Sequence, residues 1–568
     1  MHSNPPNQAT SAASACDRRT FLRRGVIAGA GMAATMGTTS AAAAAVARRA
    51  SAPRKQPNLL VVMVDQLRET SLLPTSLPLG SVMPRVAALG RSSVRFERHY
   101  TAGNDCSPAR GVLVTGLYSH QTGCLITGKG LLSPGLPTWG TMLREVGYQT
   151  SWWGKWHLNP DPYASLDQYG FSGGTYPSPN GGPGQGTRKD PQIAHQFHEW
   201  FTNSAGDEPW CTTVSFVNPH DIAWWWRYTN EIPAEATPPT YVDAMPTNFE
   251  TPEQLAAANK PQLQQALQAT MARSFGDVPF DGPDAEPMWS GLMNTYLMLA
   301  SYVDIEVGKV LDTLASRPKV AANTIVVFTA DHGEYGGAHG MRGKGAAAYE
   351  EATRVPLYVH DPRGVATSAV QVPRTQLTSS ADVSSMLLTL ATGSRKWRRE
   401  PGFSHLAARH DLAAICRDPG APGRLYAIHA TDEDVTEFVS DLTLANAPRH
   451  LIAVRTPYGK LATYSNWVPG TIEIDSIGEQ RELYDYSTPA GQLELDNVEG
   501  ASSLEEPLQG ALNYAIRSEL RAPLPTRLQA AQNAGIQNYL AGEVTEDAKV
   551  QADEQTGSGN PSAAVGAS

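Results

Sequence analysis

Short runs of apolar residues recur along the chain, and longer segments with helical periodicity lie between them. The apolar runs are residues 58–64, 148–153, 212–217, 324–329 and 355–359. Strands that are apolar throughout are typical of a parallel sheet that is covered on both faces. Residues 294–315 carry apolar side chains three and four positions apart, as on one face of a helix. Strands and helices that alternate in this way predict an α/β fold.

The second half of the chain predicts a smaller α+β unit. Residues 450–456 and 460–464 have the pattern of a hairpin around Pro457-Tyr458-Gly459, and a helical pattern follows at 506–520. We therefore expect a catalytic domain at 58–420 and a small antiparallel-sheet subdomain at 421–525. The polar, Gly/Ser-rich stretch 541–568 predicts a disordered tail.

Two other segments lack a clear period. Residues 172–191 are rich in Gly, Pro, Ser and Asn, which predicts a long loop. Residues 222–292 are rich in Pro, Gln and Ala, and we interpret them as an insertion over one edge of the sheet.

The first 47 residues have the features of an export signal. Arg18-Arg19 and the residues up to Arg24 are similar to a twin-arginine motif, an uncharged stretch follows, and Ala45-Val46-Ala47 is a candidate cleavage site. A weakly hydrophobic anchor and a disordered Ala-rich tail are the alternatives. Residues 48–57 would then be a linker, and no later stretch is apolar enough for a membrane span. We expect a periplasmic or secreted protein.

Charge and cysteine content narrow the possible functions. The formal net charge is −10, and it becomes −13 without residues 1–47, which disfavours binding to nucleic acid or to anionic lipid. An anionic substrate would need a local positive site. The five cysteines show no CxxC or zinc spacing, so a disulfide scaffold is not expected.

Two pairs of polar residues directly follow predicted strands. They are Asp65-Gln66 and Asp331-His332. Ligands of open α/β sheets bind at the carboxyl ends of strands, and hard cations prefer oxygen donors. The two pairs together therefore predict one cation site, although an Asp after a strand also serves as a helix cap or turn residue.

A further cluster lies in Asn104-Asp-Cys-Ser-Pro-Ala-Arg-Gly111. Ser107 and Pro108 suit the start of a helix, which would place Cys106 at the positive end of that helix. An anionic nucleophile or a bound anion is favoured there, and Arg110 adds a fork suited to sulfate or phosphate oxygens. Alternatively, Cys106 is a buried structural residue.

The segment Cys106-Ser-Pro-Ala-Arg110 matches the Cys-x-Pro-x-Arg signature of the sulfatase family, and other segments resemble that family in the same order. These segments are Asn58–Gln66, Leu113–Tyr118, Gln121–Gly123, Gly154–Leu158, Asn218–Asp221, Thr329–Glu334, Gly343–Lys344, Tyr349–Pro356, Ala453–Pro457 and Glu482–Asp485. The resemblance implies an alkaline-phosphatase-like fold, with a large mixed sheet between helices and a small C-terminal α+β subdomain.

The resemblance also implies residue roles. A formylglycine-generating enzyme would oxidise Cys106 to formylglycine, whose hydrate is the nucleophile and also a metal ligand. One divalent cation would be held by Asp65, Gln66, Asp331 and His332. The remaining catalytic residues would be Arg110 beside the diol, Lys155 and Lys344 on the sulfate, and His157 and His220 in proton transfer. The implied activity is hydrolysis of sulfate monoesters of small molecules or sugars, as in an arylsulfatase.

Two departures from the family pattern leave alternatives open. The commoner pairs are Asp-Asp and Asp-Asn, whereas this chain has Asp65-Gln66 and Asp331-His332. An imidazole ligand shifts preference from Ca²⁺ toward metals such as Mn²⁺. The same combination resembles the phosphonate monoester and phosphate diester hydrolases of the family, which gives the alternative activity. A non-catalytic binding protein is a third possibility.

Three consecutive tryptophans, Trp224-Trp225-Trp226, follow Asp221. They are either core residues beneath the insertion or an aromatic wall at the mouth of the site. Such a wall would suit an aryl group, a sugar ring or a quaternary ammonium.

Overall fold

The computed structural model describes residues 56–73, 77–128, 131–227, 238–432, 444 and 446–556, with side chains up to residue 543. The expected signal segment 1–47, most of the linker and residues 557–568 lie outside the described residues. Among the described helices, none has the length and apolar content that a bilayer crossing requires.

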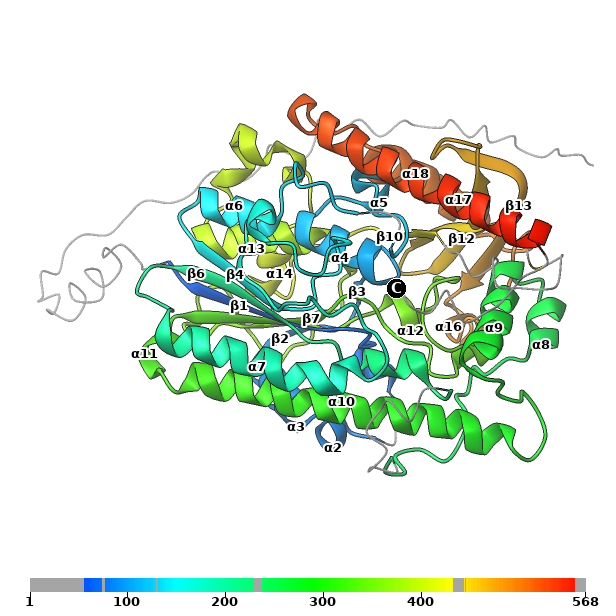
Figure 1. Ribbon diagram of the computed structural model, residues 1–568, viewed down its shortest axis with the longest axis horizontal. Coiled ribbons are helices and arrows are strands. Elements are labelled where there is room, and N and C mark those ends of the chain that lie inside the picture. The colour runs from blue at the N-terminus through cyan, green and yellow to red at the C-terminus, as the bar shows by residue number, and fades with distance from the viewer. Residues whose placement is uncertain are drawn as a thin grey trace, which may run out of the picture. The chain divides into compact units, whose positions relative to one another are not determined.

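A seven-stranded mixed sheet forms the centre of the protein (Figure 1), in the order β2-β8-β7-β1-β6-β4-β5. Strands β7, β1, β6, β4 and β5 run parallel, whereas β8 pairs antiparallel with β7, and β2 antiparallel with β8. The strands are β1 (Asn58–Val64), β2 (Val94–Phe96), β4 (Gln149–Gly154), β5 (Ser172–Gly173), β6 (Trp210–Ser215), β7 (Thr324–Ala330) and β8 (Leu357–His360). The five apolar runs are thus confirmed as strands.

Helices cover both faces of the sheet. Successive side chains of β1 point to opposite faces, and they are apolar on both. Leu59, Val61 and Met63 face one core together with α4 (Cys106–Thr115), α6 (Trp139–Glu145) and α13 (Val383–Thr392). Leu60, Val62 and Val64 face the other core. That core contains α3 (Pro84–Arg91), α7 (Gln185–Asn203) and α10 (Ala285–Ala315). In Figure 1, α7 and α10 run side by side below the sheet.

The other α-helices and strands, with the one 3-10 helix that bears on the site, follow in chain order. They are α2 (Leu79–Val82), β3 (His99–Tyr100), α5 (Ser119–Thr122), η3 (His220–Trp224), α8 (Pro252–Ala257), α9 (Gln262–Phe275), α11 (Pro318–Ala321), α12 (Glu350–Thr353), β9 (Thr378–Ser379), α14 (Leu412–Arg417), β10 (Ala427–Asp432), β11 (His450–Arg455), β12 (Gly459–Trp467), β13 (Ile474–Asp485), α16 (Pro489–Gln492), α17 (Glu505–Ala515) and α18 (Thr526–Thr556).

The predicted C-terminal unit is present as an antiparallel sheet in the order β10-β11-β12-β13, with α17 packed on one face. The expected hairpin is β11 and β12. Contacts within the chain do not separate this sheet from the large one, so a domain boundary near residue 420 stays a prediction. Within the stretch 541–568, α18 continues to Thr556 and the residues after it are not described, so the expected disordered tail stays a prediction.

Two segments without a clear period contain more helix than their sequences predict. The loop predicted at 172–191 ends earlier, since α7 begins at Gln185. The insertion 222–292 is more helical than its weak period suggested, and it includes α8, α9 and the start of α10. Helix α9 packs Leu263 and Leu267 against Tyr464 and Tyr484 of the small sheet. The insertion therefore reaches the C-terminal sheet as well as the large one.

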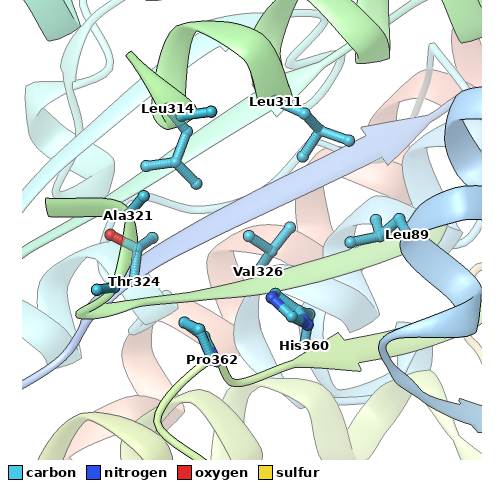
Figure 2. Close-up of a pocket in the computed structure, with 10 residues that line it drawn as sticks. Leu89, Leu311, Leu314, Ala321, Thr324, Val326, His360 and Pro362 are labelled. Atoms are coloured by element: carbon cyan, nitrogen blue, oxygen red, sulfur yellow. The ribbon is translucent and has the colours of Figure 1, made fainter. Parts of the chain in front are cut away.

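An apolar pocket of about 280 Å³ lies beside the beginning of β7 (Figure 2). Its lining includes Leu311, Leu314 and Val326, with Thr324 and His360 as polar members. Thr324 begins β7 and Asp331 follows its last residue. The pocket is therefore at the opposite end of this strand from the polar residues described next.

Candidate active site and metal centre

The polar residues predicted to act together follow parallel strands at one edge of the sheet. Val64 of β1 is paired with Ala330 of β7, so Asp65 and Asp331 leave the sheet side by side. Lys155 directly follows β4. Cys106 is the first residue of α4, which is buried along its whole length. Open α/β sheets bind their ligands at this end, the carboxyl ends of the parallel strands.

Four buried side chains meet there. Sγ of Cys106 lies 3.2 Å from Nε2 of His332 and 3.7 Å from Oδ1 of Asp65. The same Nε2 is 3.6 Å from Oδ1 of Asp65 and 3.8 Å from Oδ1 of Asp331. One ligand atom from each of the four residues lies within 4.8 Å of the others.

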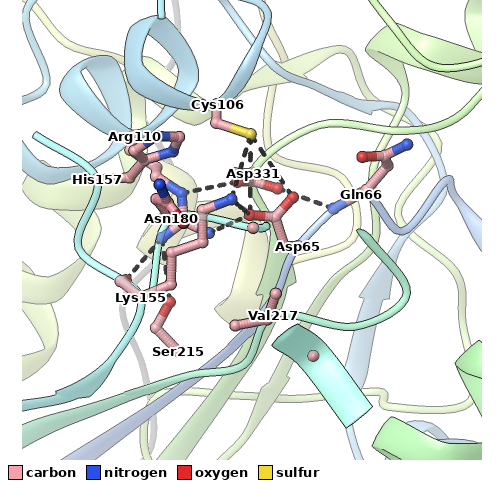
Figure 3. Close-up of polar contacts among 12 residues, drawn as sticks. Asp65, Gln66, Cys106, Arg110, Lys155, His157, Asn180, Ser215, Val217 and Asp331 are labelled. Carbon is pink, nitrogen blue, oxygen red and sulfur yellow. Dashed lines mark hydrogen bonds and ion pairs between the residues drawn. The ribbon is translucent and has the colours of Figure 1, made fainter. Parts of the chain in front are cut away.

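Arg110 and Lys155 balance the two carboxylates (Figure 3). Nη2 of Arg110 is 2.7 Å from Oδ2 of Asp65, and its Nε is 2.9 Å from Oδ2 of Asp331. Nζ of Lys155 is 2.8 Å from Oδ2 of Asp65 and 3.5 Å from the Cys106 sulfur. Nη1 of Arg110 donates to the carbonyl of Lys155 and to Ser215 of β6. The guanidinium thus joins the ends of four strands.

Gln66 lies beside this group and not within it. Its backbone N–H donates to Oδ1 of Asp331, but Figure 3 shows its carboxamide turned away from the Cys106 sulfur. Nε2 of Gln66 donates to Glu334, and Oε1 accepts from Nζ of Lys344 at 2.7 Å. In this position the side chain of Gln66 contacts Lys344, and a share of Gln66 in the metal site stays a prediction.

Glu334 is a residue whose part the sequence analysis missed. Its buried carboxylate accepts from Gln66 and from the backbone N–H groups of Gly336 and Gly343, at 2.9 and 2.8 Å. It therefore fixes both the carboxamide of Gln66 and the turn that carries Lys344. The motif Thr329–Glu334 contained it, but the motif gave no sign of this contact.

Burial and neighbouring charges set the protonation of the candidate ligands. Although burial opposes ionisation, Lys155, His220 and Arg110 hold the pKa of Asp65 well below its usual value. Burial alone would lower the pKa of His332, but Asp331 and Cys106 raise it to about 9. An imidazole ligand must be neutral, so a metal that binds here displaces a proton from His332.

The donor set fits a divalent cation. Oδ1 of Asp65, Oδ1 of Asp331 and Nε2 of His332 converge on one point beside Cys106. Oδ2 of Asp331 is buried and pairs with Nε of Arg110 at 2.9 Å, while Oδ1 of Asp331 lies on the side of His332. Two carboxylates and one imidazole suit Mn²⁺ and related ions, and oxygen donors also suit Ca²⁺.

Both candidate proton-transfer histidines are near these charges. Burial, Lys155 and Arg110 lower the pKa of His157 well below its ordinary value. Burial, Lys155 and Lys344 do the same to the pKa of His220. Burial alone would lower the pKa of Lys344, but the negative charges of Cys106, Asp105 and Asp65 raise it above its ordinary value. In the free site both imidazoles are therefore neutral and Lys344 is charged.

The three tryptophans have different environments. Trp225 belongs to the core beneath the sheet and Trp224 is 7% exposed, whereas Trp226 is 44% exposed. Nε1 of Trp224 donates to the carbonyl of Gly181 at 2.6 Å. Core packing therefore describes Trp225, and the aromatic-wall interpretation stays a prediction for Trp226 alone.

The chain is similar to known proteins in sequence and in fold. The sequence profile of the sulfatase family, described as "Sulfatase", matches residues 57–394, which is more than half of the chain. The chain is 30% identical over 351 residues to the uncharacterized sulfatase YidJ of Escherichia coli K12. That match covers 55% of this chain and 64% of the relative, less than two thirds of its length.

Two solved structures share the fold. A 2-O GAG sulfatase superimposes with a TM-score of 0.63 at 20% identity, covering 84% of this chain and 96% of that one. A phosphonate monoester hydrolase from Silicibacter pomeroyi gives a TM-score of 0.61 at 20% identity, covering 83% and 97%. At this identity the likeness concerns the fold alone, and it agrees with the predicted large mixed sheet with a small C-terminal subdomain.

Proposed function

This chain belongs to the sulfatase family, and on that premise we propose that it hydrolyses sulfate monoesters at the site around Cys106. The observation that carries the proposal is the position of the Cys106 sulfur. It lies at the start of a buried helix, 3.2 Å from His332 and 3.5 Å from the ammonium of Lys155. Oxidised to formylglycine and hydrated, the residue would present two hydroxyls where the sulfur now lies.

Asp65, Asp331 and His332 would hold one divalent cation next to the modified residue. A bound cation of this kind lowers the pKa of a neighbouring hydroxyl and offsets the charge of a sulfate group. Lys155 and Lys344 would bind the sulfate oxygens, because both ammonium groups are close to Cys106. Arg110 would hold the two carboxylates and the diol in register.

The chain's own groups would move the protons. One diol hydroxyl loses its proton to the neutral imidazole of His220 or to solvent as its oxygen attacks sulfur, and the bond from sulfur to the ester oxygen breaks. His220, once protonated, or Lys344 then delivers a proton to the departing alcohol. His157 then takes the proton of the second hydroxyl. The bond from carbon to the sulfate oxygen breaks, sulfate leaves and the aldehyde reforms. Water hydrates the aldehyde again. A plain serine or cysteine lacks the second hydroxyl that expels sulfate.

The second candidate is hydrolysis of phosphonate monoesters or phosphate diesters on the same scaffold. The imidazole of His332 among the ligands favours it, and a phosphonate monoester hydrolase shares the fold. Lys155 and His157 match the sulfatase side of the family and favour the first candidate.

Parallel assays decide between the two. The chain, coexpressed with a formylglycine-generating enzyme, is given 4-nitrophenyl sulfate, 4-nitrophenyl phenylphosphonate and bis(4-nitrophenyl) phosphate. We expect kcat/KM to be greatest for the sulfate by at least about tenfold, a difference of ~1.4 kcal/mol in transition-state binding. A greater kcat/KM for either phosphorus ester would favour the alternative.

We also propose that the chain is exported through Arg18-Arg19, which lie outside the described residues. Replacing both by lysine should retain the protein in the cytoplasm. Unchanged export of that double variant, measured by cell fractionation, would exclude the twin-arginine route.

A further inference from the structure

We propose that residues 180 and 181 form a strap that fixes the imidazole of His220, and that Trp224 and Gln185 are positioning residues that hold this strap. The inference deepens the proposed function, on which it rests for the role of His220. It accounts for one of the three tryptophans and for a glycine in the loop before α7.

The strap touches His220 directly at Gly181. Gly181 has φ of +104°, and a Cβ there would lie 2.6 Å from Cε1, 2.8 Å from Nδ1 and 3.0 Å from Nε2 of His220. Contacts this short are not possible for a real side chain, so only glycine admits the ring in its present position. The edge of the imidazole therefore rests on the backbone of Gly181.

Among the described residues, no hydrogen bond at Nδ1 sets the orientation of the ring. Histidines in proton transfer are usually oriented by a hydrogen bond to the second ring nitrogen. Nδ1 of His220 is buried and has no hydrogen-bond partner among the residues that the structure describes. Contact with Gly181 thus replaces the usual hydrogen bond.

Two side chains hold the strap in place. Nε1 of Trp224 donates to the carbonyl of Gly181 at 2.6 Å. Oε1 of Gln185 accepts from the backbone N–H groups of residues 180, 181 and 182, at 2.9, 2.6 and 3.2 Å. Because Trp224 ends the turn that His220 begins, the same turn supplies the ring and fastens the strap over it.

The segment around His220 is also tied to the start of α7. The carboxylate of Asp221 accepts from the backbone N–H groups of Gly186 and Thr187, both at 2.9 Å. The carboxylate of Asp190 accepts from those of Val217 and Asn218, at 2.7 and 3.0 Å. The strap, the helix start and the His220 turn therefore form one connected unit.

The test compares esters whose leaving groups differ in their need for a proton. 4-Nitrophenolate can leave without being protonated, whereas an alkoxide needs a proton from the enzyme as it departs. Gly181→Ala places a methyl group against the ring, and Trp224→Phe removes the donor to the strap. Gly182→Ala is the matched control, because its Cβ would approach only Oδ1 of Asn180, at 3.7 Å.

We expect Gly181→Ala to lower kcat for an alkyl sulfate at least about tenfold and kcat for 4-nitrophenyl sulfate less than about threefold. Trp224→Phe should show a smaller loss in the same direction, and Gly182→Ala should resemble the wild type. Equal losses on both esters would show a merely structural role and overturn the proposal. So would a Gly181→Ala variant that resembles Gly182→Ala.

His220→Asn separates failure of this inference from failure of the proposed function. A loss selective for the alkyl ester in His220→Asn supports the proton-transfer role. If the loss is the same for both esters, His220 does not act in proton transfer. The NMR signals of the His220 ring then test whether the strap positions it. Gly181→Ala should shift the His220 ring signals and Gly182→Ala should not; unchanged signals in both would refute the strap.

Discussion

The sulfur of Cys106 lies 3.2 Å from Nε2 of His332, and both atoms face Oδ1 of Asp65. The proposed nucleophile and a proposed metal ligand are therefore neighbours before any ion is bound. Modification of one residue and metal binding by the other should therefore influence each other.

Cys106→Ser should turn over very slowly, because serine can attack sulfur but has no second hydroxyl to expel sulfate. We expect kcat to fall by at least about a thousandfold, or ~4 kcal/mol, with accumulation of a sulfated enzyme. Peptide mass spectrometry of the active wild type should show the aldehyde at position 106, reactive with hydrazides. Unmodified Cys106 in fully active protein would refute the proposed nucleophile.

Asp331→Ala should abolish metal binding as well as activity, because Asp331 supplies one of the two carboxylates of the ligand group. Metal content per chain, measured by inductively coupled plasma mass spectrometry, gives a readout that does not depend on activity. His332→Asn should shift the preference from Mn²⁺ toward Ca²⁺, since an amide oxygen replaces an imidazole. Wild-type metal content in Asp331→Ala would rule out this site.

The lowered pKa of His157 predicts a specific pH dependence. Burial, Lys155 and Arg110 lower this pKa below 6.5, so the imidazole stays neutral and able to accept a proton in mildly acidic solution. The acid limb of kcat/KM should therefore lie below pH 6.5. Because the unfolded chain takes up the proton first, stability should also decrease as the pH falls below about 6.5.

Thermal unfolding between pH 4 and 8 checks the stability part of this prediction. His157→Gln should show a weaker loss of stability below pH 6.5 than the wild type. A stability profile of the variant that parallels the wild type would show that His157 does not contribute.

The strand positions could be predicted from the sequence because a strand buried on both faces is apolar on both, as in β1 from Leu59 to Val64. The placement of Asp65 beside Asp331 followed from the same pattern, since both residues end parallel strands. Helix α7 was missed because Pro191 and the glycines before it are typical of loops. In the structure, Asp221 accepts from the first backbone N–H groups of α7, and this contact is invisible in a linear pattern.

The position of Gln66 also could not be predicted. Sequence neighbours at a strand end both appear available to an ion, but Gln66 has φ of +65° and its side chain leaves the strand in another direction. Its partners, Glu334 and Lys344, are about 270 residues away in the sequence, at separations of 268 and 278.

Glu334→Gln should weaken substrate binding through Lys344. The carboxylate fixes the Gln66 amide, and an amide in its place no longer determines which end of Gln66 faces Lys344. We expect KM for an aryl sulfate to rise about three- to tenfold, equivalent to roughly 0.7–1.4 kcal/mol of lost binding. Steady-state kinetics measure the effect, and an unchanged KM would argue against this role of Glu334.

Substitution of Trp225 and of Trp226 should affect different properties, stability for Trp225 and substrate binding for Trp226. Trp225→Ala removes a core side chain and should cost about 3–5 kcal/mol of stability without changing substrate selectivity. Trp226→Ala should leave the melting temperature nearly unchanged, because this side chain is 44% exposed. If Trp226 contacts the alcohol part of the ester, KM for aromatic or cationic esters should rise in this variant. An unchanged KM across an ester panel would place Trp226 outside the site.

The burial of Cys106 bears on whether this residue is modified before or after the chain folds. Its side chain is 1% exposed, and every residue of its helix is buried. A maturing enzyme that must grip residues on both sides of Cys106 cannot do so once α4 is seated beneath the sheet ends. The proposed oxidation of Cys106 would therefore have to take place while the chain is newly made and still open. Any protein that folds before it is modified would then remain inactive for its lifetime.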